Sequence, residues 1–531
     1  MRTLYCNGKI YTGDTFTEAF IVENGRFVSV GSNDDMLKER YDDIHDLKGD
    51  FVCAAFNDSH MHLLGLGNSL NVAVLSEHTS SLEDMLEYLK DFMSKKDLQE
   101  GQWLKGRGWN QDYFTDVKRM PEKKDLDTVS SRNPIILTRA CGHCCVLNSR
   151  ALELAKIGPA TVSPEGGAID YEKGLLFDNA IDMISGYIPA PSKDEIKDMI
   201  RSAVGCLNAY GITSSQTDDY STFRQVPYET INEAYRELSA DGELKVRVYE
   251  QANFTTPEEL KEFIAKGNTS GTGDLMFKIG PLKMLGDGSL GSRSACLSIP
   301  YNDDPDNRGF CLFSDEQMNE MVSIANSNGM HAVVHAIGDA CLDQVLDAME
   351  KALDENPRKD HRHGIVHCQI SRPDQLERIK KLGLHVYAQS IFLDYDNHIV
   401  SDRVGEKLAS SSYNWKTLMK KGVTVSNGSD APVELPDVMK GIECAVTRTS
   451  LDGTGPYLPL EAFTVKEAID SFTKCSAYAS FEEGYKGLIK EGYLADFVIL
   501  DEDPFTTDER KLHEIKVKET YLGGQCVYRK K

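Results

Sequence analysis

The middle of the chain alternates short apolar segments with longer segments of helical periodicity, and this alternation constrains the fold more than any other feature. Residues 277–285 and 331–336 are apolar runs of strand length, and a helical pattern at 317–328 lies between them and ends at Gly329. Strands that alternate with helices are typical of a parallel sheet, because parallel neighbours need a crossover connection. We therefore expect an α/β fold in which eight strands close into a (β/α)8 barrel of the TIM type.

The same pattern predicts where the individual elements lie. Ser192 and Glu195 have the spacing of a capping box, and apolar residues from Ile196 to Leu207 follow on one helical face. The other expected helices are 257–266, 317–328, 342–353, 375–382 and 415–421. The expected barrel strands after the first are 212–217, 245–249, 277–285, 331–336, 363–368, 384–389 and 423–426.

His and Asp residues recur where these strands should end. His60 and His62 close the first apolar run, His335 and His367 end two later ones, and Asp430 follows the last. In a barrel these strand ends meet in one mouth, and alternate residues of a strand face the same side. The His-x-His pair alone fits a solvated strand edge equally well, but the ordered set favours a metal site in a hydrolase.

The two ends of the chain resemble each other and differ from the middle. Residues 19–30 read as two strands around Asn24-Gly25, and residues 520–528 repeat this hairpin pattern around Gly523-Gly524. Residues 495–500 read as a further strand. We expect a small β-sandwich domain built from residues 1–50 and 485–531, a barrel at 51–484, and an insertion in the barrel at about 65–190.

Composition excludes several classes of partner. The 531 residues carry 59 basic and 83 acidic side chains, and the net charge of −24 argues against nucleic acid and anionic membranes as partners. No run approaches the roughly 18 apolar residues of a membrane span, and the first residues lack the apolar core of a signal peptide. The 13 cysteines follow no framework spacing, so we expect reduced thiols and a cytoplasmic location.

Seven stretches match one known family in order along nearly the whole chain. They are residues 56–62, 106–109, 283–293, 335–339, 363–369, 428–434 and 492–500. Together they resemble the amidohydrolase superfamily, specifically its YtcJ-like branch (amidohydrolase family 3), which includes N-substituted formamide deformylases. The resemblance implies a site for two divalent metal ions, with zinc as the expected metal and other divalent metals as alternatives.

The resemblance also assigns ligands within this chain. His60 and His62 would bind the first ion, His335 and His367 would bind the second, and Asp430 would contact the first ion and act as general base. Lys283 would carry a carbamate derived from carbon dioxide and bridge both ions. This modification is physically reasonable, because desolvation lowers the pKa of a lysine and leaves a nucleophilic amine. A buried lysine paired with Asp287 is the alternative.

The implied reaction is hydrolysis of a C–N bond in a small molecule, with a linear amide such as an N-substituted formamide as the expected substrate. A cyclic amidase, a deaminase or an esterase on the same site is an alternative. A non-catalytic small-molecule-binding protein is another, but it would call for a broken ligand set. By resemblance we also expect a homodimer. Substrate contacts are expected from residues in or near the matching motifs, namely Trp109, His143, Asp287, Arg293 and Gln389.

One motif points to a different chemistry. Cys141, Gly142, His143 and Cys144 have the C-x-x-C spacing of thioredoxin-like redox sites. That fold needs its own compact βαβ domain around the motif, which the sequence does not provide. A structural zinc site at the same place lacks a second Cys or His pair nearby. The hydrolase interpretation is therefore the better supported one.

Overall fold

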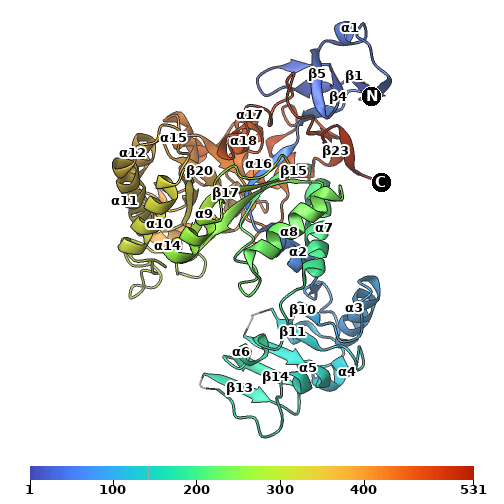
Figure 1. Cartoon of the computed structure of the whole chain (residues 1–531). Helices are drawn as coiled ribbons and strands as arrows, with labels where there is room; N and C mark the ends of the chain where they lie inside the picture. Colours follow the sequence, from blue (N-terminus) through green and yellow to red (C-terminus); the bar gives the residue numbers. More distant parts are fainter. Residues whose placement is uncertain (141–142, 165) are drawn as a thin grey trace. The chain divides into compact units, whose positions relative to one another are not determined.

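The structure is a computed structural model that describes residues 1–140, 143–164 and 166–531 (Figure 1). The chain divides into two compact units. One comprises residues 1–67 together with 193–531, and the other comprises residues 68–192.

Eight parallel strands form the barrel of the first unit. In spatial order they are β8 (Phe56–Met61), β15 (Ile212–Thr217), β16 (Arg247–Asn253), β17 (Phe277–Leu285), β18 (Ala332–Ala336), β19 (Gly364–His367), β20 (His385–Ala388) and β21 (Val425–Asn427). The ring nearly closes just beyond β21, where Asp430 N donates to His60 O at 2.9 Å and His62 N donates to Ala431 O at 2.7 Å. The expected (β/α)8 barrel is confirmed.

Helices follow the barrel strands along the chain, as a barrel requires (Figure 1). Thr256 caps the N-terminus of α9, and Gly383 ends α12 in the left-handed conformation at φ 66°. The helices between strands are α7 (Lys193–Ala209), α8 (Tyr228–Ala240), α9 (Pro257–Ala265), α10 (Asp315–Ser327), α11 (Asp339–Glu355), α12 (Pro373–Leu382), α13 (Leu393–Asp396), α14 (Val400–Ala409) and α15 (Trp415–Lys420). Outside this series lie α1 (Asn33–Met36), α2 (Leu63–Leu70), α16 (Val438–Thr447), α17 (Val465–Ser471) and α18 (Lys474–Ala479).

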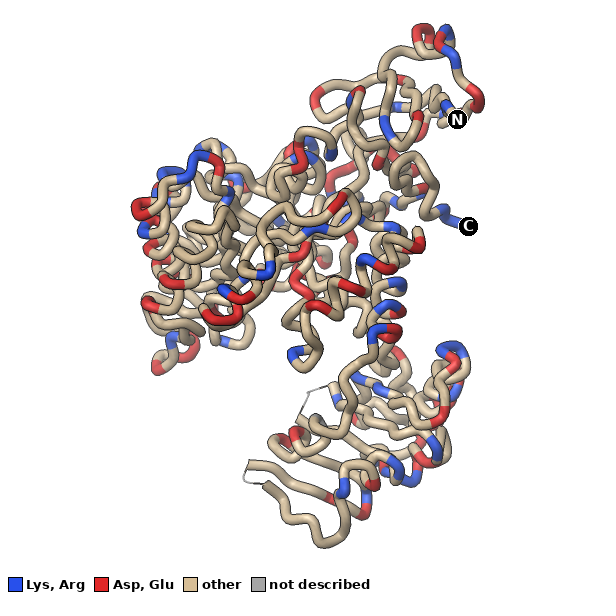
Figure 2. The backbone as a smooth tube through the Cα atoms, viewed as in Figure 1, with Lys and Arg blue, Asp and Glu red and all other residues tan. Residues whose placement is uncertain are grey.

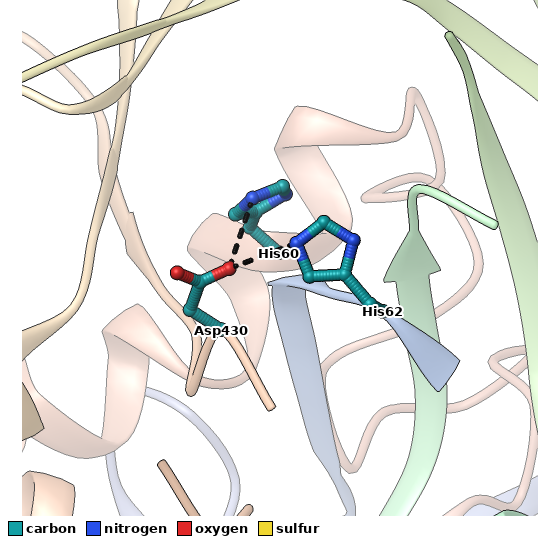
Figure 3. Close-up of side chains that lie close together, drawn as sticks. All are labelled: His60, His62 and Asp430. Carbon is teal, nitrogen blue, oxygen red and sulfur yellow. Dashed lines mark ion pairs between the residues drawn. The ribbon is translucent and has the colours of Figure 1, made fainter. Parts of the chain in front are cut away.

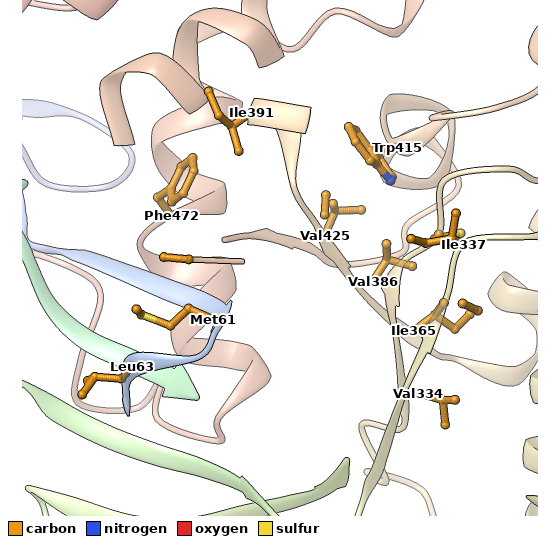
Figure 4. Close-up of a cluster of buried hydrophobic side chains, with 14 of the residues drawn as sticks. Met61, Leu63, Val334, Ile337, Ile365, Val386, Ile391, Trp415, Val425 and Phe472 are labelled. Atoms are coloured by element: carbon orange, nitrogen blue, oxygen red, sulfur yellow. The ribbon is translucent and has the colours of Figure 1, made fainter. Parts of the chain in front are cut away.

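The barrel strands are buried on both faces. Alternate residues of a strand point to opposite sides, and the packing follows this rule. One side faces the helices and belongs to the largest apolar cluster, which includes Val334, Ile365, Val386 and Val425 (Figure 4). The other side holds a separate buried cluster of Val333, Val366, Tyr387 and Ala479. Full burial of one such aliphatic side chain contributes about 1.5–3 kcal/mol, so the strands are held from both sides.

This unit has two further sheets, one built from N-terminal strands alone and one built from both chain termini. A four-stranded sheet has the order β5 (Arg26–Gly31), β4 (Ala19–Glu23), β1 (Arg2–Cys6) and β6 (Asp43–Asp46). A six-stranded sheet has the order β24 (Gln525–Arg529), β23 (Val517–Leu522), β22 (Phe497–Leu500), β7 (Phe51–Ala54), β2 (Lys9–Tyr11) and β3 (Phe16–Thr17). Because β7 pairs with β22, the N-terminal and C-terminal segments share one sheet. The expectation of terminal β structure built from both ends is confirmed.

A buried ion pair joins the barrel to this six-stranded sheet. Arg247 at the start of β16 donates from Nε to Asp496 Oδ2 at 2.7 Å and from its second guanidinium nitrogen to Oδ1 at 3.0 Å. Both side chains are less than 10 % exposed. Asp496 Oδ1 also accepts a hydrogen bond from Gly523 N at 2.7 Å. A bidentate pair of this kind fixes both the distance and the orientation of the two elements.

The second unit has its own sheet and core. The sheet order is β13 (Gly167–Asp170), β14 (Leu175–Asp178), β12 (Cys144–Leu147), β11 (Ile135–Arg139), β10 (Leu104–Trp109) and β9 (Ala73–Val74). Its helices are α3 (Leu82–Lys95), α4 (Lys123–Asp127), α5 (Ser149–Leu154) and α6 (Asp182–Ser185). Apolar side chains of α3, such as Met85 and Leu89, pack with Leu104 and Leu137 of the sheet.

Charge is spread along the chain. Lysines and arginines alternate with aspartates and glutamates over the helices and loops, without a long segment of one sign (Figure 2). The excess of acidic residues is therefore distributed rather than gathered into one tail. Within the described residues, the helices are too short or too polar to cross a membrane.

A buried charge cluster predicts a specific loss of stability in acid. Glu482 contacts Lys278 at 2.8 Å and also pairs with Lys486. Burial by itself raises the pKa of Glu482. The two ammonium groups outweigh burial and bring this pKa from its ordinary value of 4.5 down to about 2. Because the folded pKa is depressed, the cluster stabilises the fold above about pH 4.5, and this contribution of about 3 kcal/mol is lost as the pH falls towards 2.

Denaturant unfolding between pH 6 and pH 3 tests this. We expect the free energy of unfolding of the wild type to approach that of Glu482→Gln as the pH falls, because the variant has no carboxylate to protonate at this position. Glu262→Gln is the matched control, since Glu262 is 70 % exposed in its pair with Lys266. Parallel curves for wild type and Glu482→Gln would contradict the prediction.

Candidate metal centre

Three ligand-type side chains converge at the mouth of the barrel. His60 lies near the end of β8, His62 follows that strand, and Asp430 follows β21 (Figure 3). Asp430 Oδ1 is 3.3 Å from His60 Nε2 and 3.2 Å from His62 Nε2. In the described part of the chain, this is the one group of three or more His, Cys, Asp or Glu whose ligand atoms all lie within 4.8 Å of one another.

Neighbouring groups orient both imidazole rings. His60 Nδ1 is 2.7 Å from Gln251 Oε1, and His62 Nδ1 is 2.9 Å from the backbone oxygen of Asp218. Since both partners are acceptors, each Nδ1 carries the proton and donates it. Both Nε2 atoms therefore face Asp430 Oδ1, and each is the ring nitrogen that would bind a cation in place of a proton.

Gln251 gives a direct test of this orienting contact. We expect Gln251→Leu to weaken divalent-metal affinity by about 10–100-fold, because His60 loses the acceptor that fixes its tautomer and ring orientation. Competition with a chromophoric chelator measures the affinity. Gln525→Leu, at an exposed glutamine of β24, should bind metal like the wild type. Unchanged affinity in Gln251→Leu would show that the contact does not position His60.

The charge distribution at this group fits a cation. Burial raises the pKa of Asp430, but His60 and His62 lower it by more, so the pKa lies well below its usual range. Burial lowers the pKa of His62, whereas Asp430 raises it to about 9. No described residue donates a hydrogen bond of normal geometry to Asp430 Oδ1, although this atom is buried. A buried carboxylate oxygen facing two imidazole nitrogens is a donor set typical of zinc and similar divalent metals.

Asp430 and His367, two of the predicted metal ligands, have unusual backbone geometry. Asp430 has φ 58°, His367 has φ 74° and the next residue, Cys368, has φ 49°. Positive φ is uncommon for residues other than glycine and costs roughly 1–3 kcal/mol. In β19 the side chain of Val366 already packs on the inner face, so strict alternation would turn His367 outwards. The left-handed turn instead brings its ring to 4.4 Å from that of His335, measured between centres.

The other expected ligands lie near this group without joining it. His367 Nδ1 is 2.7 Å from Gln389 Oε1, and its ring centre is 5.8 Å from that of His60. His335 Nε2 faces Gly288 O at 3.1 Å. Lys283 is buried, and its Nζ is 3.8 Å from Asp218 Oδ2 rather than paired with Asp287. Burial lowers the pKa of Lys283.

Asp287 links the end of β17 to the end of β18. Its carboxylate accepts hydrogen bonds from the backbone nitrogens of Ile337 at 3.0 Å, Gly338 at 2.8 Å and Cys296 at 2.8 Å. Its Oδ1 also lies 3.3 Å from His335 Nε2. These contacts occupy both carboxylate oxygens of Asp287 and hold the loops that follow β17 and β18 together.

The remaining predicted substrate residues are dispersed. Trp109 is fully buried in the core of the second unit and donates from Nε1 to Leu137 O at 3.1 Å. His143, also in the second unit, is 77 % exposed and pairs with Asp178. Arg293 forms a bidentate ion pair with Asp303 in the loop between β17 and α10. Of the redox motif, Cys141 and Gly142 lie outside the described residues, and Cys144 begins β12.

Gln389 occupies the position closest to the metal-ligand candidates. Its Oε1 contacts His367, whereas its Nε2 has no hydrogen-bond partner among the described residues and is buried. The side chain therefore combines an orienting contact with a donor that remains available to another molecule.

Sequence reasoning missed Gln251 and Asp218. Asp218 directly follows β15, so its place at a strand end was the same signal that pointed to His60 and Asp430. Its carboxylate accepts hydrogen bonds from Ser221 at 3.0 Å and Asn253 at 2.9 Å. Gln251 lies within β16 in a run of polar residues, which was an available signal for a strand facing a polar interior.

A cavity of about 280 Å³ reaches Asn253 at the end of β16. Asn253, which lines it, donates to the same Asp218 carboxylate that faces Lys283. Its wall has an apolar part and a polar part. The apolar residues are Leu285, Leu312 and Phe313, and the polar ones are Ser221, Arg224, Asn253, Thr255 and Gln317. A volume of this size holds a small molecule.

Comparison with known proteins decides the family. The model of the amidohydrolase family matches residues 43–528. The chain belongs to the amidohydrolase family. This family member is 34 % identical to YtcJ of Bacillus subtilis, whose name describes an amidohydrolase, over the full length of both proteins. It is also 24 % identical to the N-substituted formamide deformylase of Arthrobacter pascens, over 96 % of this chain and 95 % of that protein.

A solved structure supports the same assignment. An uncharacterised metal-dependent hydrolase from Pyrococcus furiosus has a TM-score of 0.79 and 30 % sequence identity, and the match covers 95 % of this chain and 100 % of that one. Membership of the family identifies this protein as a hydrolase.

Proposed function

We propose that the protein hydrolyses a C–N bond of a small amide, with N-substituted formamides as the first substrate class. The observation that carries the proposal is the convergence of two histidine nitrogens on one buried oxygen of Asp430, at 3.2–3.3 Å. The full-length likeness to a formamide deformylase supports this choice of bond.

Each residue of the group has a part in this reaction. His60 and His62 would hold a divalent cation, with zinc as the expected ion. When bound, such a cation lowers the pKa of water and polarises a carbonyl oxygen. Asp430 would take the proton of the attacking water at a carboxylate oxygen and return it to the amine nitrogen as the C–N bond breaks. Its pKa lies below the usual range, so the carboxylate is ionised, as a proton acceptor must be.

A second ion is part of the proposal. His335 and His367 would hold it, and Lys283 would bridge the two ions as a carbamate. The neutral amine of Lys283 would form an N–C bond with carbon dioxide and release one proton. Burial lowers the pKa of this lysine, which favours the neutral amine. His335 would have to turn from Gly288 O to serve as a ligand.

The cavity lined by Asn253 would receive the substituent of the substrate. Leu285, Leu312 and Phe313 offer apolar contact, and Gln389 Nε2 offers a buried donor to the amide oxygen. Trp109, His143, Asp287 and Arg293 stay weaker proposals for substrate contact, since each is already engaged elsewhere or exposed.

The test combines metal content with a substrate panel. Protein purified without chelator is analysed by plasma mass spectrometry and assayed on N-substituted formamides, longer linear amides, cyclic amides and esters. We expect one or two zinc ions per chain and release of amine from a formamide. Turnover of a cyclic amide or an ester alone would move the assignment to the alternative reactions on the same site. Ligand binding without turnover by the metal-loaded protein would overturn the hydrolase proposal.

Two further expectations belong to this proposal. A cytoplasmic location fits the absence of disulfides among the described cysteines. A homodimer follows from the family resemblance, and sedimentation equilibrium of the full chain tests it directly.

A further inference from the structure

Two cysteines in the connection between β17 and α10 lie in contact. The Sγ atoms of Cys296 and Cys311 are 2.9 Å apart, although 15 positions separate the residues in sequence. Both side chains are partly exposed, so a small oxidant can reach them. A disulfide bond is about 2.05 Å long. A shift of about 1 Å therefore separates the two thiols from a bond.

The backbone around this pair is tied to Asp287. Cys296 N donates to Asp287 Oδ2 at 2.8 Å, and Leu312 N, next to Cys311, donates to Gly286 O at 2.8 Å. The two thiols thus belong to segments that are anchored on two consecutive residues, Gly286 and Asp287. Asp287 in turn lies 3.3 Å from His335 Nε2.

The packing against the end of β18 is equally close. A Cβ atom added to Gly338 would lie 2.1 Å from Cys296 O, so a side chain at this position has no room. Cys296 O also accepts a hydrogen bond from Ala340 N at 3.0 Å. Movement of Cys296 would therefore displace the loop that follows His335.

We propose that Cys296 and Cys311 form a reversible disulfide that fixes this connection against the end of β18 and so links the thiol state of the protein to the position of His335. The link to His335 as a metal ligand rests on the proposed function. The disulfide itself does not.

The chemistry balances with a hydroperoxide as oxidant. The sulfur of one cysteine attacks the O–O bond, which breaks, and the products are a sulfenic acid and an alcohol, or water when the oxidant is hydrogen peroxide. The second sulfur then attacks the sulfenic sulfur. An S–S bond forms, the S–O bond breaks and a second molecule of water leaves. A dithiol reductant reverses the step by thiol–disulfide exchange.

A third thiol offers Cys311 an alternative disulfide partner. Cys341 is buried near the start of α11, and its Sγ contacts His335 O at 3.9 Å and also interacts with Cys311. Contact with Cys311, and then burial, raise the pKa of the Cys296 thiol, so spontaneous oxidation is slow and an added oxidant is needed.

Peptide mapping of the full chain tests the pairing. The protein is treated with hydrogen peroxide or with a dithiol, remaining thiols are alkylated under denaturing conditions, and the digest is analysed by mass spectrometry. We expect the oxidised wild type to lose two hydrogen atoms and to yield a peptide that joins Cys296 to Cys311. Cys296→Ser and Cys311→Ser should lack this peptide, and Cys206→Ser, a partly exposed cysteine of α7, should retain it.

Hydrogen exchange tests the effect on the connection. Amides between residues 296 and 312 should exchange at least about tenfold more slowly in the oxidised wild type, and not in oxidised Cys311→Ser. A link from Cys311 to Cys341, or no link at all, would overturn the pairing. A disulfide without slower exchange would overturn the fixing of the connection. Absence of turnover in both thiol states would count against the proposed function and leave the disulfide standing.

Discussion

Asp430→Asn should lose nearly all turnover while the protein stays folded. The substitution keeps the size of the side chain but removes the anionic oxygen that lies 3.2–3.3 Å from His60 Nε2 and His62 Nε2. It takes away both a metal ligand and the proposed proton acceptor. Loss of general acid–base catalysis alone lowers rates by about 10²–10⁴-fold, so we expect a fall in kcat/KM of at least this size.

Metal content after dialysis is the second readout, and it is independent of the substrate. We expect Asp430→Asn to retain less metal than the wild type. Asp452→Asn is the control, because Asp452 is 60 % exposed in its pair with His398. Wild-type turnover together with wild-type metal content in Asp430→Asn would remove Asp430 from the site. Wild-type metal content with lost turnover would confine its role to proton transfer.

Arg247→Met should strongly destabilise the fold although the residue lies outside the site. It leaves the carboxylate of Asp496 buried without its cation, and breaking a buried pair in this way costs about 3–5 kcal/mol. Asp496→Asn should be destabilising for the converse reason, and it also weakens the acceptor of Gly523 N. Equilibrium unfolding in denaturant measures both.

The double variant Arg247→Met/Asp496→Leu separates pairing from burial. With both charges removed, we expect it to be more stable than either single variant, because no unpaired charge remains. Lys261→Met, in an ion pair whose two side chains are about half exposed, should change the free energy of unfolding by less than about 1 kcal/mol. Additive effects of the two single changes would show that Arg247 and Asp496 do not act as a pair.

The barrel could be predicted because several of its strands are short, largely apolar runs and the helices between them carry clear ends. The strand β17 lies at Phe277–Leu285, as the sequence predicts. The strand β16 was predicted less well. The sequence predicts a strand at 245–249, whereas β16 runs from Arg247 to Asn253. Its second half contains Glu250 and Gln251, and apolar periodicity cannot detect a strand segment made of polar residues.

The candidate site could be predicted only in outline. His60, His62 and Asp430 follow from their places at strand ends, since those places meet in any barrel. The direction of His367 does not follow, because its φ of 74° reverses the alternation that a strand pattern assumes. Gln251, which orients His60, gives no motif of its own. The roles of Trp109 and Arg293 depended on motif position, and position does not show which partner a side chain has.

The seam of the barrel bears on how the chain is made. Ser429 donates to the buried Asp58 carboxylate from both its backbone nitrogen and its hydroxyl, across 371 positions of sequence. At about 5–20 residues per second, a ribosome completes the second partner roughly 20–70 s after the first. Throughout that interval one edge of β8 has no partner strand, and unpaired edges invite association with other chains. During biosynthesis the edge of the first barrel strand is therefore exposed for tens of seconds before the segment that covers it has been made.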